Sequence, residues 1–246
     1  MAEPTLTLTL TNIRDEVAHY LYGNTAYDDL AADEKTIVDR RIRDGLARFY
    51  GAREWGFLKV WTTLTTAAST ASYDLPDGAG YIEGPLFFPS ESGYPEIRTV
   101  DAETVHRHWQ ESMTGGVPMI AALQPKTSAG TAGQKNEIIF WPVPDAEYVL
   151  TYKYRILPDA LADAAQYALG GSAHSQTIRA ACLAEAEMRD NDTIGMYTAD
   201  YTRLLEQSIA YDARAYAPRS LGRMGNGRLG RRIRTLRPSL TLEVEE

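Results

Sequence analysis

The chain has 246 residues, of which 44% are hydrophobic and 24% are charged, a composition typical of a globular protein with a sizeable core. Its single cysteine, Cys182, excludes an internal disulfide and a metal site built from several cysteines. No run of about 20 apolar residues occurs, and the first residues lack the basic region and apolar core of a signal peptide, so we expect neither a membrane span nor export.

The net charge of −8 is unevenly distributed along the chain. Residues 214–237 contain eight arginines and no acidic residue, which leaves −16 on the rest of the chain. An acidic body with a basic end indicates two partners of different character. The arginines are Arg214, Arg219, Arg223, Arg228, Arg231, Arg232, Arg234 and Arg237.

The N-terminal residues predict an extended segment followed by a helix. Residues 5–11 alternate threonine and leucine, which favours an extended segment with its leucines on one face. Asn12 is a candidate N-cap for a helix that continues to Tyr22 and ends at Gly23. The leucines of the extended segment are Leu6, Leu8 and Leu10.

A longer amphipathic helix is predicted to begin at Asp33. Its apolar positions repeat at helical spacing and form one stripe, while Arg40 and Arg43 lie on the opposite face. These arginines would suit a nucleic-acid surface, but a solvated helix face is the favoured interpretation. The stripe contains Val38, Ile42, Leu46, Phe49 and Tyr50.

Composition changes at Trp55, and residues 55–154 are rich in the aromatic and β-branched residues of strands, interrupted by glycine and proline. Strands are predicted over 59–66, 81–88, 96–100, 119–123 and 137–141, with a short strand before the turn at 74–78. Asp101 is expected to cap a short helix over 102–111. The polar residues 128–136 predict a flexible loop.

Residues 137–161 predict a β-hairpin. Ile138 and Phe140 alternate with their neighbours, as do Val149 and Thr151 after a turn that contains two prolines. Pro158 is expected to end the second strand. The nearby tyrosines suit either an interface or a packed sheet, and even spacing favours the sheet; they are Tyr148, Tyr152 and Tyr154.

Helical spacing returns after Pro158. Residues 174–189 are rich in alanine, which would allow a close approach between helices, and residues 196–216 form a second helix with one apolar stripe. The predicted fold class is α+β, with a helical bundle formed by the N- and C-terminal helices, an inserted β-rich region and an extended basic C-terminal arm. The predicted boundaries are 1–54 for the N-terminal extended segment and helices, 55–158 for the β-rich insertion, 159–217 for the C-terminal helices and 218–246 for the arm.

The sequence predicts neither an enzyme nor a cofactor or metal site. His106 and His108 point to nearly opposite sides of a helix, and no third ligand follows at a recognisable spacing. The pair Asp190 and Asp192 begins like a calcium loop, but Ile194 occupies a ligand position. No phosphate-binding loop, dinucleotide fingerprint or hydrolase nucleophile motif occurs.

Several short motifs in a fixed order resemble the head-to-tail adaptor proteins of tailed bacteriophages. The similarity spans most of residues 13–217, and the order of the motifs is more specific than any one of them. The motifs are Trp55 and Trp61, Tyr73-x-Leu75-Pro76, Phe140-Trp141-Pro142-x-Pro144-Asp145, Tyr148-x-Leu150-x-Tyr152-x-Tyr154 and Pro158-x-x-Leu161.

The resemblance implies a structural protein of the virion, assembled in the bacterial host cytoplasm. Such adaptors usually form a ring of twelve subunits between the portal protein and the tail or nozzle protein, and genomic DNA passes through the ring. The acidic body would then let DNA slide along the channel without adhering.

The basic arm is the predicted docking segment. Residues 239–244 alternate like a strand that could add to a sheet edge, whereas simple fraying is the alternative. The runner-up function is nucleic-acid binding through the arginines and glycines of the same arm. The residues predicted to dock on the portal are Arg219, Arg223, Arg228, Arg231, Arg232, Arg234, Arg237, Leu240 and Leu242.

Overall fold

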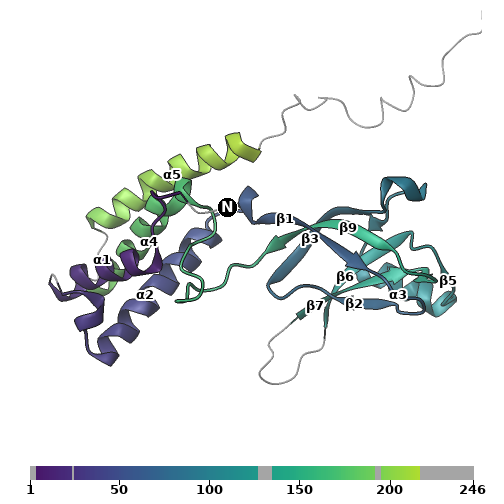
Figure 1. Cartoon of the computed structure of the whole chain (residues 1–246), viewed down its shortest axis with the longest axis horizontal. Coiled ribbons are helices and arrows are strands. Elements are labelled where there is room, and N and C mark those ends of the chain that lie inside the picture. The colour runs from purple at the N-terminus through teal and green to yellow at the C-terminus, as the bar shows by residue number, and fades with distance from the viewer. Residues whose placement is uncertain (1–3, 24, 127–134, 192–194, 217–246) are drawn as a thin grey trace, which may run out of the picture.

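A computed structural model describes residues 4–23, 25–126, 135–191 and 195–216. Four long helices gather on one side of the molecule, and the strands lie on the other side together with one short helix (Figure 1). The fold is α+β, as the sequence predicts. The long helices are α1 (Leu10–Tyr22), α2 (Ala32–Gly51), α4 (Ser172–Asn191) and α5 (Met196–Tyr216), and the short one is α3 (Ala102–Glu111).

The four long helices share one buried core. The predicted stripe of α2 faces this core, and the alanines of α4 allow the two helices to approach closely. A Cβ built on Gly45 would lie 2.6 Å from the Cα of Cys182, so only glycine fits at that crossing. The small-residue surface predicted for α4 is therefore confirmed as a helix-packing surface.

Nine strands lie in the described residues and, with α3, form the other part of the molecule. A three-stranded antiparallel sheet has the order β1-β9-β3, a four-stranded mixed sheet has the order β2-β7-β6-β4, and β5 pairs with β8. The strands are β1 (Lys59–Thr65), β2 (Ser72–Asp74), β3 (Ala79–Phe87), β4 (Arg98–Thr99), β5 (Gly115–Gly116), β6 (Ile120–Lys126), β7 (Lys135–Trp141), β8 (Val143–Pro144) and β9 (Val149–Ile156). Three short 3-10 helices complete the described elements: η1 (Tyr27–Asp29), η2 (Gly56–Leu58) and η3 (Ser90–Ser92).

The two larger sheets enclose a second core. Backbone hydrogen bonds between Leu86 and Ile97 join β3 to the segment before β4, so the two sheets meet along one side. The side chains between the sheets come from both of them, and include Leu150 and Tyr152 of β9 as well as Ile138 and Phe140 of β7. Tyr148 and Tyr154 pack against the same cluster, which confirms the packed-sheet interpretation of these tyrosines.

The predicted hairpin over residues 137–161 is wrong. Strands do form on both sides of the prolines, but β7 belongs to the four-stranded sheet and β9 to the three-stranded sheet. Pro142 has no backbone N–H, and Val143 and Pro144 pair with the glycines of β5 instead of turning the chain back. The segment between β7 and β9 is therefore a crossover between sheets.

The predicted start of the first helix is also wrong. The helix begins at Leu10, and Thr9 is its N-cap, with Asn12 completing a capping box from the third helical position. The Asn12 side chain accepts a hydrogen bond from the Thr9 N–H over 3.0 Å. Leu10 is buried in the helical core, whereas Leu6 is exposed, so the leucines do not share one extended face.

Candidate interaction surfaces

The residues predicted to dock on a portal lie outside the described residues. They begin at Arg219, whereas the structure describes the chain only as far as Tyr216. Their predicted role therefore stays a prediction. The described part of the chain ends with α5, and the last turns of this helix contact η2.

The end of α5 is anchored beside the beginning of β1. The backbone N–H of Gly56 donates to both carboxylate oxygens of Asp212, over 3.0 and 3.2 Å, and Asp212 is only 2% exposed. One turn later Tyr216 lies against Gly56, where an added Cβ would overlap its ring. Because η2 leads directly into β1, the C-terminal segment leaves the described structure next to the first residues of that strand.

An aromatic cluster lies next to this contact between α5 and Gly56. The ring of Trp55 stacks on Phe49 with centroids 4.6 Å apart, and His174 lies against Trp55, Phe57 and Tyr211. Burial lowers the pKa of His174, and the nearby Asp212 carboxylate opposes this shift only in part. His174 is therefore a neutral core residue that packs α2, α4 and α5 against the start of the β region.

A buried carboxylate joins the last two helices. Glu187 of α4 accepts hydrogen bonds from the backbone N–H groups of Gly195, Tyr197 and Thr198, at the beginning of α5. The Thr198 hydroxyl donates to the same carboxylate over 3.0 Å. Burial would raise the pKa of Glu187, but these hydrogen bonds outweigh it and hold the pKa below its ordinary value. Glu187 thus caps α5 from a different helix.

The two larger sheets differ in what covers their outer faces. Helix α3 covers the four-stranded sheet, where Val105 packs on Ile139 and Ala122. The outer face of the three-stranded sheet carries Trp61, which is 58% exposed, together with the exposed Phe87 and Val149. The rings of Trp61 and Phe87 lie 6.1 Å apart, centroid to centroid. This exposed apolar group, which we call the Trp61 face, is a candidate surface for protein contact.

One end of the Trp61 face is charged. Lys59 of β1 donates to Glu83 of β3 over 2.8 Å, and Lys153 of the intervening β9 lies 3.2 Å from the other oxygen of the same carboxylate. The hydrogen bond from Lys59 is the main cause that lowers the pKa of Glu83. The two ammonium groups share one carboxylate, which leaves one net positive charge at this end of an otherwise apolar face.

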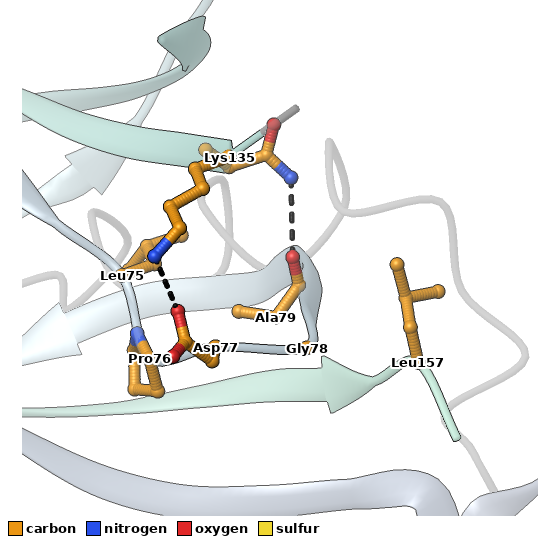
Figure 2. A pocket seen from close by; sticks show the side chains of 8 residues that line it. Leu75, Pro76, Asp77, Gly78, Ala79, Lys135 and Leu157 are labelled. Atoms are coloured by element: carbon orange, nitrogen blue, oxygen red, sulfur yellow. Dashed lines mark hydrogen bonds and ion pairs between the residues drawn. The ribbon is translucent and has the colours of Figure 1, made fainter. Parts of the chain in front are cut away.

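A pocket of about 320 Å³ lies at the edge of the β region (Figure 2). The Lys135 ammonium reaches across it to Asp77 over 2.8 Å, and Leu157 closes its far side. The Asn136 amide donates to the carbonyl oxygens of Ala79 and Gly80, which fixes β7 to the start of β3. The two charges in the pocket are already paired with each other, so the pocket holds no free acid, base or nucleophile.

The described residues contain no group of three or more histidine, cysteine or acidic side chains able to hold a metal ion. His106 forms a hydrogen bond to Gln124 over 2.7 Å, and His108 stacks on Trp141. Burial raises the pKa of the Cys182 thiol to about 12, which leaves it unreactive. Within the same part of the chain, no helix is long and apolar enough to span a membrane.

Sequence reasoning missed the residues that hold α5 in place and the Trp61 face. Asp212 follows Ser208 by four residues on the buried side of α5, so a polar pair within the buried stripe was an available signal. Glu187 gave no such signal, because its partners belong to the next helix. Trp61 was recognised as part of a strand, but its exposure depends on which face of the sheet another element covers.

The comparison with protein families gives a match over almost the whole chain. Residues 8–226 match the SU10 adaptor protein family. The matched range includes all four long helices and both larger sheets. No curated protein sequence matches the chain.

Proposed function

The chain belongs to the SU10 adaptor protein family, a family of phage head-to-tail adaptors, and from this premise we propose that it forms a ring between the portal and the tail or nozzle protein. A structural role in the virion follows from the family itself. The finer parts of the proposal are the ring, which we expect to hold twelve subunits, the passage of genomic DNA through its centre and assembly in the host cytoplasm.

The family match over residues 8–226 is the observation that carries the proposal. The described residues support it through the Trp61 face, an exposed apolar surface suited to contact with another protein. A ring subunit needs side surfaces that match its own copies, and the asymmetric exposure of the two sheets suits that need.

We propose that the basic arm docks on the portal protein. Its arginines would pair with carboxylates, and Leu240 and Leu242 would bury apolar area on the partner. Because α5 is tied to Gly56, the arm starts from a fixed point on the subunit. This reduces the freedom lost when the arm binds.

A deletion of residues 222–246 tests portal docking. The truncated protein should keep the helical content and unfolding temperature of the full chain, because the deleted segment lies beyond α5, and it should lose binding to the portal. A full-length variant with Arg40→Ala and Arg43→Ala is the control, since it removes two exposed arginines from α2 and should bind normally. Undiminished binding by the truncated protein would contradict the docking proposal.

The charge of the arm also supports a second candidate function, nucleic-acid binding. Arginines interspersed with glycines can contact phosphates in any sequence, and such binding weakens steeply as salt is added. An electrophoretic shift with duplex DNA across a salt series separates the two functions. Strong DNA binding without portal would favour the second function, whereas portal binding that persists at salt concentrations that abolish DNA binding would favour the first.

The DNA channel is a further part of the proposal. An acidic wall would repel DNA phosphates and let the genome pass without adhering. The body outside the basic segment carries −16, which supports such a wall. A ring structure with a predominantly basic bore would contradict it.

A further inference from the structure

Among the described residues, the outer edge of β1 is an open sheet edge. β1 is the first strand in the order β1-β9-β3, and no backbone hydrogen bond joins its outer edge to another described segment. Val60 and Leu64 are only partly buried along this edge, and the exposed Trp61 lies on the outer face. A seven-residue strand with one unpaired edge and partly buried apolar side chains forms a template for an additional strand, and native proteins normally cover or interrupt such edges.

The chain contains a segment suited to that edge. Residues 239–244 read Ser-Leu-Thr-Leu-Glu-Val, so three apolar side chains fall on one face of an extended strand and polar side chains on the other. Such a strand would place Leu240, Leu242 and Val244 beside the partly buried core-side residues of β1. The polar side chains would then face solvent.

The path of the chain brings this segment to β1. Tyr216, the last described residue, lies against Gly56, and β1 begins three residues after Gly56. Residues 217–238 connect Tyr216 to Ser239, and a chain of this length can span up to roughly 70 Å, so Ser239 can reach β1. A tether of this kind holds a segment near its target at an effective concentration on the order of millimolar.

We propose that residues 239–244 of the free subunit add to the outer edge of its own β1 as a fourth strand of the three-stranded sheet. The added strand satisfies backbone groups of β1 and covers Val60 and Leu64. The proposal goes beyond portal docking, because it assigns a binding site to the arm within the subunit itself. Where the arm also docks on a portal, Leu240 and Leu242 must first leave β1, so the two sites compete.

Hydrogen exchange of the isolated protein, without portal, tests the proposal. The full chain is compared at low concentration with a chain that ends at Arg237. Removing the last residues should speed exchange in residues 59–65 at least about tenfold, because the outward amides of β1 lose their partner. Exchange in residues 120–126 of β6 should not change, since that strand belongs to the four-stranded sheet and is not a neighbour of β1. Equal exchange of residues 59–65 in the two proteins would overturn the proposal.

Two single substitutions in the full chain separate strand addition from a general effect of charge. Leu242→Asp places a charge on the core-side face of the added strand and should release the strand, with fast exchange in residues 59–65. Thr241→Asp adds the same charge on the solvent face and should leave exchange slow. Fast exchange in both variants, or slow exchange in both, would contradict the predicted orientation of the strand and with it the proposal.

Cysteine pairs identify the chain that supplies the strand. The natural Cys182 is fully buried and does not compete, so one cysteine at Thr63 and one at either Thr241 or Glu243, which share the outer face with Thr63, are the only accessible thiols. Mild oxidation should produce a disulfide within one chain for at least one of the two pairs. A disulfide-linked dimer instead would show that a second copy supplies the strand, and would overturn the same-chain assignment. Because portal is absent from all these measurements, their outcome is independent of the portal-binding test.

Discussion

The two larger sheets of this protein enclose one core but face the outside differently. The four-stranded sheet buries Ile139 beneath α3, with Val105 of that helix completing a small third cluster. The three-stranded sheet leaves Val149, Phe87 and Trp61 exposed on its outer face. Apolar side chains on the outer face therefore stabilise the fold in one sheet, whereas in the other sheet they remain exposed and available for contact with a partner. An adaptor needs both: a stable body and an apolar surface that is covered only after assembly.

The largest expected effect is on the covered face. Ile139→Ala should lower the free energy of unfolding by about 2–4 kcal/mol, because it removes buried methylenes and leaves a cavity beneath α3. Val149→Ala is the matched change on the open face and should cost less than about 0.5 kcal/mol. Urea unfolding of both variants gives the comparison, and similar losses in the two would show that the outer face of the three-stranded sheet is not free.

Replacing a charged side chain should likewise cost more where the side chain is buried than where it lies near the exposed Trp61 face. Glu187→Gln leaves N–H groups at the start of α5 with a weaker acceptor and should lower the free energy of unfolding by about 1–3 kcal/mol. Glu83→Gln removes a partly exposed ion pair near the Trp61 face and should change it by no more than about 0.5 kcal/mol. Urea unfolding at neutral pH measures both, and a larger effect of the Glu83 change would contradict this expectation.

The effect of Glu187 should depend on pH in a defined direction. Its pKa is lowered in the folded protein, so its contribution is complete above the ordinary value near 4.5 and is lost as pH falls through the folded pKa. The difference in unfolding free energy between the natural protein and Glu187→Gln should therefore shrink as pH falls below 4.5. A difference that stays constant down to pH 2 would rule out the charged cap.

His174 should also make stability depend on pH. This effect should be smaller than that of Glu187 and should occur at a higher pH. Its pKa is lowered in the folded protein, so the unfolded chain binds a proton more readily, and stability should fall as pH drops below about 6.5. In His174→Phe this part of the pH dependence should disappear. Thermal unfolding between pH 7.5 and 5 checks it, with His19→Phe as the control because His19 lies at the exposed end of α1.

The smallest expected effect on folding belongs to Trp61→Ala. Because the side chain is 58% exposed, the free energy of unfolding should change by less than about 0.5 kcal/mol. Assembly should respond differently, since a large aromatic residue on an open face contributes strongly when a partner covers it. Sedimentation of the variant with portal and tail proteins tests this, and unaltered assembly would remove the Trp61 face from the candidate surfaces.

The sequence predicted individual helices and strands better than it predicted which strands pair. The bounds of α3 and α5 agree with the predicted 102–111 and 196–216, because apolar spacing marks each helix; Asp101 lies at the N-cap position of α3, but its side chain makes no capping hydrogen bond. The pairing of β7 and β9 was wrong, since proximity along the chain does not decide between two sheets that enclose one core. The first helix began earlier than expected because alternating leucines near Leu10 suggested a strand, although Thr9 and Asn12 form a capping box.

The candidate surfaces were less accessible to sequence reasoning. The exposure of Trp61 is decided by the position of α3, which covers only one sheet, and the anchor at Asp212 requires a contact with Gly56, far away along the chain. Neither contact has a local signature. The arm, by contrast, is predicted from its charge and spacing, and it lies outside the described residues.

The mass of the purified protein, measured alone and after mixing with the portal protein, tests the adaptor function most directly. We expect the protein alone to be a monomer or small oligomer, and the mixture to contain a complex with about one copy of this chain per portal subunit. Failure of the full-length, folded protein to bind the portal at any ratio would contradict its proposed place at the head-to-tail junction.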